Sequence, residues 1–250
     1  MKFAMKSIVA AAAFVAAGVA SAAAITVPAG VISPDFDGMT FTGAGSLSFS
    51  ADLLGALDTG KVSVAGYGAA TATVVKDADG FYTEASASAP ITALTIDSVS
   101  KQVLAAATTG GATQTAPVLK SVSSGGSLTV TDLNVDLAAK KVYATIIGGN
   151  GVGTLNNFYL WDIGTITGAT AVAGNGTYTT SLTGLSITTE GFNTFVKSLG
   201  LLNLGKSALM GVTDFGTITS TITAVPEPST YALMGLGLAG MGLVARRRAK

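Results

Sequence analysis

The chain of 250 residues contains neither cysteine nor histidine, and these two absences exclude several kinds of chemistry. Without cysteine there is no disulfide, no thiolate nucleophile and no cysteine-ligated metal. Without histidine the chain lacks the commonest general base and the commonest ligand of transition metals. Ser-His-Asp and Cys-His hydrolases, most zinc enzymes and histidine-ligated haem are therefore excluded. We expect a protein that is not an enzyme, with no catalytic residue and no resident cofactor.

Charged residues are also scarce, at 11% of the chain, and their distribution is uneven. Six of the fourteen Lys and Arg residues lie in the first six or last five positions. Between residues 25 and 224, eight basic and thirteen acidic residues remain, so this central part is mildly acidic. Nucleic-acid binding depends on Lys and Arg that neutralise phosphates. We therefore expect no nucleic-acid partner.

The central part is rich in Gly, Ser and Thr, with β-branched residues at short intervals. At 133–137 the sequence LNVDL alternates apolar and polar residues, and KKVYATII at 140–147 follows as its hairpin partner. Asn-Gly at 175–176 is a hairpin-turn dipeptide. We predict a mainly β fold with an antiparallel β-sandwich-like body over 25–224. A stretch of Gly, Thr, Ser and Ala at 108–126 predicts a seam within it.

One short amphipathic helix is predicted within this pattern, over the sequence TTEGFNTFVKSLG at 188–200. Its apolar positions follow the spacing i, i+3, i+4 and i+7: Phe192, Phe195, Val196 and Leu199. Thr188 or Thr189 serves as the N-cap, and Gly200 ends the helix. We expect the apolar face of this helix to cover one end or edge of the sheets.

The first 24 residues have the three parts of a secretory signal peptide. Two lysines precede an apolar run at 8–19, which is too short to span a bilayer comfortably. Ala20 and Ala22 supply the small residues before a cleavage site, and cleavage follows Ala22 or Ala24. We expect Sec-type export machinery and signal peptidase as partners. The alternative is a buried N-terminal helix.

The other end of the chain also has three parts. They are, in order, Val225, Pro226, Glu227, Pro228 and Ser229, then an apolar helix predicted at 231–245, then Arg246, Arg247 and Arg248. Fifteen helical residues at about 1.5 Å each span roughly 22 Å, which is short of a hydrocarbon core of about 30 Å. Arginines at the tip of a transmembrane helix stay on the cytoplasmic side, so the body lies outside. The two prolines keep the preceding stretch extended, outside helix or sheet.

This order of parts resembles the PEP-CTERM sorting signal, which is found in exported proteins of Gram-negative bacteria that make extracellular polysaccharide. The resemblance covers about 25 residues and implies recognition by a membrane exosortase and removal of the tail near Pro-Glu-Pro. It further implies an inner-membrane intermediate, followed by release or attachment at the cell surface. It implies nothing about the fold of the body. The alternative is an ordinary loop before a membrane anchor.

The region 128–223 resembles the HtaA-type domains of bacterial haem-uptake proteins in the order of its segments. These segments are LTVTDLNVDLAAKKVYATI, a strand pair, and LTGLSITTEGFNTFV. The resemblance implies a β-rich fold and haem held by a tyrosine. Tyr67, Tyr143 and Tyr178 are the tyrosines that we consider for this role.

Two glycine motifs match nucleotide-binding patterns in a context that argues against nucleotides. Gly200 to Ser207 reads GLLNLGKS, the phosphate-loop pattern, which needs a strand before it and a helix after it. Here a helix is predicted before it, so we interpret the motif as a helix end followed by a loop. Gly235 to Gly240 matches G-x-G-x-x-G inside the apolar segment, where small residues allow close helix contact.

Two acidic loops and one aromatic segment are the remaining candidates for ligand binding. Asp77, Asp79 and Glu84, and separately the PDFDG segment at 34–38, have oxygen ligands spaced for Ca²⁺, although Asp-Gly is also a common turn. Tyr159 and Trp161 in NNFYLWD offer a face for stacking sugars. The alternative for the aromatic residues is burial, with alternate members on opposite faces of a strand.

We therefore expect a non-enzymatic, exported protein with a structural or adhesive role in the cell surface or the exopolysaccharide matrix. A surface module that binds haem or a glycan is the alternative. An extracellular enzyme that cleaves glycans is a third hypothesis, and it requires paired carboxylates that no pattern in the sequence singles out.

Overall fold

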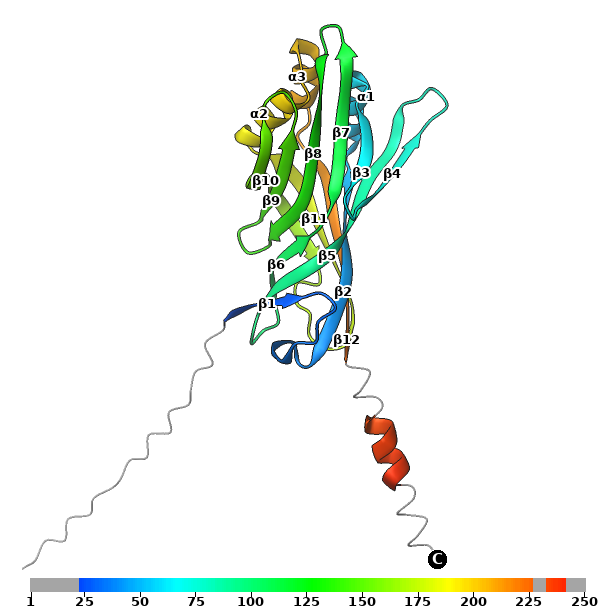
Figure 1. Ribbon diagram of the computed structural model, residues 1–250, viewed down its shortest axis with the longest axis vertical. Helices are drawn as coiled ribbons and strands as arrows, with labels where there is room; N and C mark the ends of the chain where they lie inside the picture. The colour runs from blue at the N-terminus through cyan, green and yellow to red at the C-terminus, as the bar shows by residue number, and fades with distance from the viewer. Residues whose placement is uncertain (1–22, 227–232, 242–250) are drawn as a thin grey trace, which may run out of the picture.

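The computed structural model describes residues 23–226 and 233–241, and 58% of these residues are in strands (Figure 1). The elements in chain order are β1 (Ala24–Pro28), η1 (Pro34–Phe36), β2 (Met39–Phe49), α1 (Ala51–Gly60), β3 (Ser63–Tyr67), β4 (Thr71–Lys76), β5 (Tyr82–Asp97), β6 (Val103–Thr108), β7 (Gly111–Leu119), β8 (Ser123–Asp136), β9 (Lys141–Gly148), β10 (Gly153–Gly168), β11 (Gly176–Ile187), α2 (Thr189–Ser198), α3 (Asn203–Met210) and β12 (Gly216–Pro226). The prediction of a mainly β, antiparallel body is confirmed.

The strands form one sheet that closes on itself through β5 and β6. β5 is long enough to pair with β2 and β4 along its first half and with β1 and β6 along its second half. β6 also pairs with β8, where residues 105–107 face residues 134–136. Because β8 is linked to β2 through β9, β10, β11 and β12, this contact completes a ring. The two halves of the ring face each other, as in a sandwich, but belong to a single sheet.

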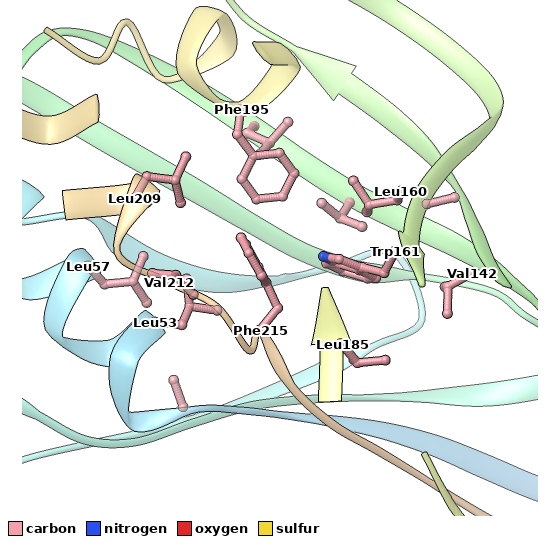
Figure 2. Close-up of a cluster of buried hydrophobic side chains, with 14 of the residues drawn as sticks. Leu53, Leu57, Val142, Leu160, Trp161, Leu185, Phe195, Leu209, Val212 and Phe215 are labelled. Carbon is pink, nitrogen blue, oxygen red and sulfur yellow. The ribbon is translucent and has the colours of Figure 1, made fainter. Parts of the chain in front are cut away.

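The interior of this ring holds two clusters of apolar side chains. The larger cluster is formed by strands β8 to β12 together with the three α-helices, and its aromatic centre is Trp161, Phe195 and Phe215 (Figure 2). The ring centroids of Phe195 and Phe215 are 6.0 Å apart in an edge-to-face arrangement. Burial of each such side chain contributes about 1.5–3 kcal/mol to stability. The smaller cluster lies around Phe36, Phe41 and Leu94.

The body contains three α-helices where one was predicted. α2 forms as predicted: the side chain of Thr188 accepts a hydrogen bond from the Gly191 N–H, and Gly200 adopts a positive φ of 62°. α1 begins after Ser50, whose hydroxyl accepts from the Leu53 N–H. α3 occupies most of the predicted loop, and it packs against α1.

Two further local predictions are corrected. Residues 108–126 contain β7 and the start of β8, which pair along their lengths, so this low-complexity stretch is part of the sheet and not a seam. Asn175 and Gly176 do not form a two-residue hairpin turn. The β10–β11 pairing ends at Gly168 and Thr180, and residues 176–179 already pair with β12.

The two ends of the body differ from the predicted boundaries by a few residues. Residues 1–22, which carry most of the predicted signal peptide, lie outside the described part. Ala23 exchanges hydrogen bonds with Ser98, and Ala24 pairs with Asp97, so both belong to the fold. At the other end, Val225 and Pro226 pair with β2 as the last residues of β12. This part of the predicted sorting motif therefore lies inside the sheet, contrary to prediction.

Of the predicted helix at 231–245, the structure describes residues 233–241, which are helical and exposed. In the part of the chain that is described, no helix has both the length and the apolar character needed to span a membrane. The remainder of this segment and Arg246, Arg247 and Arg248 lie outside the described residues.

The junction between β6 and β7 has room only for a glycine at position 110. Gly110 has a φ of +88°, and a Cβ atom there would lie 2.5 Å from the Ala70 nitrogen. The turn between β3 and β4 crosses the junction at this point. Any side chain at position 110 would push this turn away from the ring.

We predict that Gly110→Ala lowers the free energy of unfolding by about 3 kcal/mol or more, which is at the upper end of single substitutions. Gly80→Ala is the matched control, because Gly80 has a φ of +87° with nothing within 4 Å of its added Cβ. In this control the free energy of unfolding should fall only by the strain of a non-glycine residue in the left-handed conformation, about 1–2 kcal/mol. Urea unfolding of both variants measures the difference, and equal losses would contradict the steric explanation.

Candidate functional site

A continuous face of hydroxyl side chains covers the outside of four neighbouring strands. β2, β11 and β12 contain no charged residue, and Ser or Thr occupies nearly every second position in them. We define the hydroxyl face as the outward Ser and Thr residues of β2, β12, β11 and β10: Thr42, Ser46, Ser48, Thr217, Thr219, Thr221, Thr223, Thr177, Thr179, Ser181, Thr183, Thr165 and Thr167.

The strand register aligns these hydroxyls in rows that cross the strands. One row runs through six strands without interruption: Thr167, Ser181, Thr219, Ser46, Ser88 and Thr71. In another row the hydroxyl oxygens of Thr177 and Thr223 are 3.1 Å apart. Alternate residues are about 6.8 Å apart along a strand and neighbouring strands about 4.8 Å apart. The face is thus a regular array of uncharged donors and acceptors.

Two tyrosines form an aromatic pair at the border of the hydroxyl face. Tyr143 of β9 is the register partner of Tyr159 of β10, and their ring centroids are 5.5 Å apart. The Nζ atom of Lys141 lies 4.5 Å from the centroid of the Tyr159 ring. The hydroxyl of Tyr159 donates a hydrogen bond to the carboxylate of Asp162, whose register partner on β11 is Ser186. Half-buried aromatic rings beside charged groups are suited to stack on a sugar and hydrogen-bond its hydroxyls.

The structure separates Tyr159 and Trp161, the two residues of the predicted ligand face. Trp161 is 2% exposed and belongs to the core, as does its neighbour Leu160. Simple alternation would place Tyr159 and Trp161 on the same face. A bulge between Tyr159 and Trp161 in the pairing with β9 breaks the alternation and turns the indole inward. Tyr143, and not Trp161, lies beside Tyr159.

Lys141 and Tyr143 are the site residues that sequence reasoning missed in this role. The signal for them was present, because KKVYATII was already predicted as the partner of the preceding strand. The register between β9 and β10 was not predicted, and it alone brings Tyr143 opposite Tyr159.

The acidic calcium candidates serve as turn residues. The Asp77 carboxylate accepts hydrogen bonds from the N–H groups of Asp79 and Phe81 in the β4–β5 hairpin. Within residues 23–226 and 233–241, no group of three Asp or Glu residues is arranged to hold a metal ion, so Asp77, Asp79 and Glu84 do not gather as such a site.

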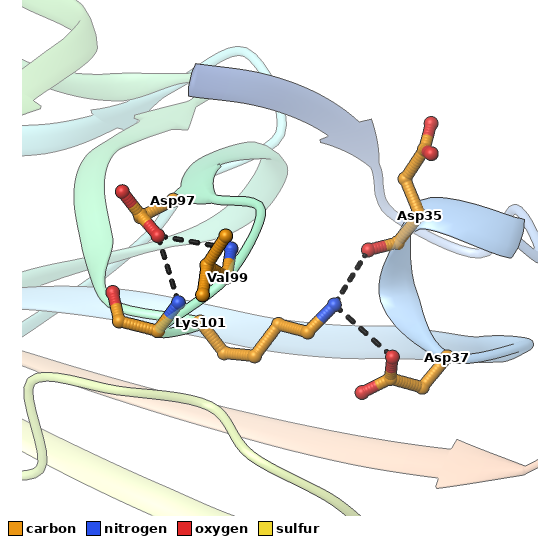
Figure 3. A network of polar contacts seen from close by, with 6 residues as sticks. Asp35, Asp37, Asp97, Val99 and Lys101 are labelled. Carbon is orange, nitrogen blue, oxygen red and sulfur yellow. Dashed lines mark hydrogen bonds and ion pairs between the residues drawn. The ribbon is translucent and has the colours of Figure 1, made fainter. Parts of the chain in front are cut away.

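The second acidic loop is held by a lysine (Figure 3). The Nζ atom of Lys101 lies 3.0 Å from the Asp37 carboxylate and donates a hydrogen bond of 2.9 Å to the Asp35 carbonyl. The adjacent turn is held by Asp97, which accepts from the N–H groups of Val99 and Ser100. These two hydrogen bonds lower the pKa of Asp97.

The GLLNLGKS segment has no phosphate cradle. It follows α2 and not a strand, and α3 begins inside it. The N–H groups that would face a phosphate are used within the fold: those of Leu202 and Leu204 donate to the carbonyls of Val122 and Ser121. The dismissal of a nucleotide site is therefore supported, although the segment is part helix and not only loop.

The three tyrosines considered for haem lie on separate strands. Tyr67 is on β3, Tyr143 on β9 and Tyr178 on β11. The Tyr178 hydroxyl donates to the carbonyls of Ala173 and Gly174 in the preceding loop. Only Tyr143 lies beside another candidate residue, Tyr159.

The fold and the outer face define an antiparallel β protein with one uncharged, hydroxyl-rich face. Comparison with protein families then adds one finding, because residues 224–248 match the PEP-CTERM protein-sorting motif. The chain is accordingly an exported protein that is sorted by exosortase and directed to the cell surface. Comparison with curated proteins yields no match, and neither does comparison with solved structures. The resemblance of 128–223 to HtaA-type domains is not shown by any of these comparisons.

The Tyr159–Asp162 hydrogen bond gives a testable titration. It raises the pKa of Tyr159 to about 12, because the carboxylate stabilises the protonated phenol. Asp162→Ala should return the pKa of Tyr159 toward about 10. Ultraviolet absorbance during alkaline titration measures this, and Tyr159→Phe identifies the contribution of Tyr159.

The raised pKa of Tyr159 also determines how the free energy of unfolding depends on pH. The stabilisation is complete below about pH 10 and is lost as the pH rises through about 12. An unchanged titration in Asp162→Ala would show that the carboxylate does not hold the tyrosine.

Proposed function

We propose that the protein is a non-enzymatic, adhesive or structural component of the cell surface or of the extracellular polysaccharide matrix. The observation that carries this proposal is the hydroxyl face bordered by the Tyr143–Tyr159 pair, on a protein that is exported. A polysaccharide presents the complementary chemistry, because it has many hydroxyl groups and weakly apolar sugar faces.

The proposed binding is the sum of many modest contacts. A neutral hydrogen bond contributes about 0.5–1.5 kcal/mol after the loss of water is counted. One hydroxyl is therefore too weak to retain a ligand. A polymer that contacts several rows at once gains from effective concentration, since each further contact is intramolecular. The aromatic pair supplies the larger individual contact and sets where a sugar ring sits.

The use of the aspartates supports binding without cleavage. Six of them accept hydrogen bonds from backbone N–H groups: Asp58, Asp77, Asp97, Asp132, Asp136 and Asp214. Glycoside hydrolysis needs two carboxylates facing each other across a cleft. Carboxylates that hold turns and strand ends are committed to the fold.

The proposed route to the surface uses Sec-type export machinery, signal peptidase and an inner-membrane intermediate before exosortase acts. The two ends of the fold suggest where processing occurs. Cleavage after Ala22 keeps the contacts of Ala23 and Ala24, whereas cleavage after Ala24 removes both. Removal of the tail beyond Pro226 keeps the whole pairing of β12 with β2.

We predict that the exported form begins at Ala23, retains Pro226 and lacks Arg246, Arg247 and Arg248. Intact-mass spectrometry of the protein from the cell surface or medium measures both ends together. A mature form that keeps the three arginines would contradict removal of the tail. A form that begins at Ile25 would show that the contacts of Ala23 and Ala24 are dispensable.

We predict that the double variant Tyr143→Ala/Tyr159→Ala binds the exopolysaccharide of its host about tenfold more weakly, a loss of about 1.4 kcal/mol. Tyr67→Ala is the matched control, because Tyr67 is 41% exposed on β3, away from the pair. Co-sedimentation with purified polysaccharide measures binding, and polymer length before and after incubation measures cleavage. Unchanged binding by the double variant would remove the aromatic pair from the proposal, and shortened polymer would overturn the non-enzymatic role.

A further inference from the structure

The interior of the ring contains a cavity of about 60 Å³ between β5, β7, β8 and the aromatic core. Its wall is apolar and includes Leu47, Ala89, Val130, Phe195 and Phe215. A second cavity of about 40 Å³ lies beside it. The two cavities share Gly45, Thr108, Val135 and Ile218 in their walls, so they adjoin each other along the interior.

This space is too large and too apolar to be explained by bound water. One water molecule needs about 10–15 Å³ of such volume and two to four polar partners. The larger cavity has room for several waters, yet nearly all of its wall is carbon. An interior of this size either remains dry or accepts an apolar molecule, as engineered apolar cavities do.

The wall contains a few buried polar groups. Gln114 is 5% exposed and lines the larger cavity. The Nε1 atom of Trp161 is buried without a hydrogen-bond partner in the same part of the chain, and Figure 2 shows it directed toward Phe215. In the smaller cavity the Ser220 hydroxyl is likewise buried and unpaired among the described residues.

These unpaired groups point to a ligand that has one polar group. A buried polar group without a partner costs about 1–3 kcal/mol, and a ligand that pairs with it recovers this free energy. Within residues 23–226 and 233–241, no Lys, Arg, Asp or Glu lines either cavity. A charged head group would therefore be buried without a counter-charge, which is strongly unfavourable.

The wall also has a place where backbone pairing is interrupted. Along the larger cavity β5 and β7 lie close together. At this place β5 pairs with β4, and β7 pairs with β3. Among the described strands, β3 and β4 are joined by a turn and not by a ladder. The cavity wall at this place consists of Ala87, Ala89, Gly110, Gly111 and Ala112. Small side chains and missing ladder bonds make this the easiest part of the ring to open.

We propose that the interior of the ring is a binding site for a small, neutral amphiphile, such as an aliphatic alcohol. Its carbon chain lies in the adjoining cavities, and its polar group pairs with the Gln114 amide. The ligand enters between β5 and β7. This activity is separate from the polysaccharide binding proposed above and uses the opposite face of the sheet.

Trp161 is the only tryptophan of the chain and lines the cavity, so its fluorescence reports directly on occupancy. The experiment titrates the protein, purified in its exported form, with 1-hexanol and, separately, with hexanoate. We expect a saturable change in Trp161 emission with 1-hexanol and none with hexanoate at the same concentrations. The absence of a saturable change with 1-hexanol would overturn the proposal. An equal response to hexanoate would overturn its restriction to neutral ligands.

Two variants, together with one matched control, locate the site. Ala89→Leu fills the larger cavity and should abolish the response, whereas Ala44→Leu makes the same substitution at an exposed position of β2 and should leave it unchanged. Circular dichroism confirms that each variant folds. Gln114→Leu keeps the approximate size of the side chain and should weaken 1-hexanol binding about tenfold. Full binding by a folded Ala89→Leu variant would place the ligand elsewhere, and full binding by Gln114→Leu would overturn the role of the amide.

Discussion

The hydrogen bonds of β6 to both β5 and β8 are the constraint on which the rest of the structure depends. Without them the strands would form an open, twisted sheet with two unprotected edges. With them, the strands of the ring have one face toward an enclosed interior and one toward water. The alternation of apolar and hydroxyl residues in β2, β11 and β12 follows from this division. A hydroxyl face on the outside and an apolar space on the inside are thus two consequences of one closure.

The closed ring also explains why the two proposed binding sites do not interfere. β10 contributes to both, since Tyr159 faces outward and Trp161 faces inward from positions that regular alternation would place together. The bulge between them is therefore what separates the two sites. Repair of this bulge by deletion of one residue would move an indole to the surface or a phenol to the core.

The sequence predicts local structure well where the pattern and the chemistry agree. The hairpin of β8 and β9 follows from LNVDL and KKVYATII, and α2 follows from helical spacing and the cap at Thr188. Another helix also has a local signal in the sequence. α1 follows Ser50 with Leu53, Leu54 and Leu57 at helical spacing, which is also a cap and an apolar stripe.

Features that depend on long-range register could not be predicted. No local pattern indicates that β6 would join β5 to β8, or that Tyr143 would lie opposite Tyr159. Asn175-Gly176 is the opposite case, because here a local pattern predicts a hairpin turn that does not form. Residues 176–179 pair with β12 instead. The interior cavity is likewise invisible in the sequence, because its wall comes from strands that are far apart in the chain.

The position of the sorting motif indicates which end of the body lies next to the point of attachment or processing. β12 runs through the middle of the hydroxyl face and ends at Pro226, the third residue of the part of the chain that matches the motif. β1 lies at the same end of the body, whereas α1, α2 and α3 lie at the opposite end (Figure 1). A protein held or processed at Pro226 therefore presents its helical end away from the point of attachment. The hydroxyl rows cross the strands, so they lie across the direction of attachment and face material beside the protein.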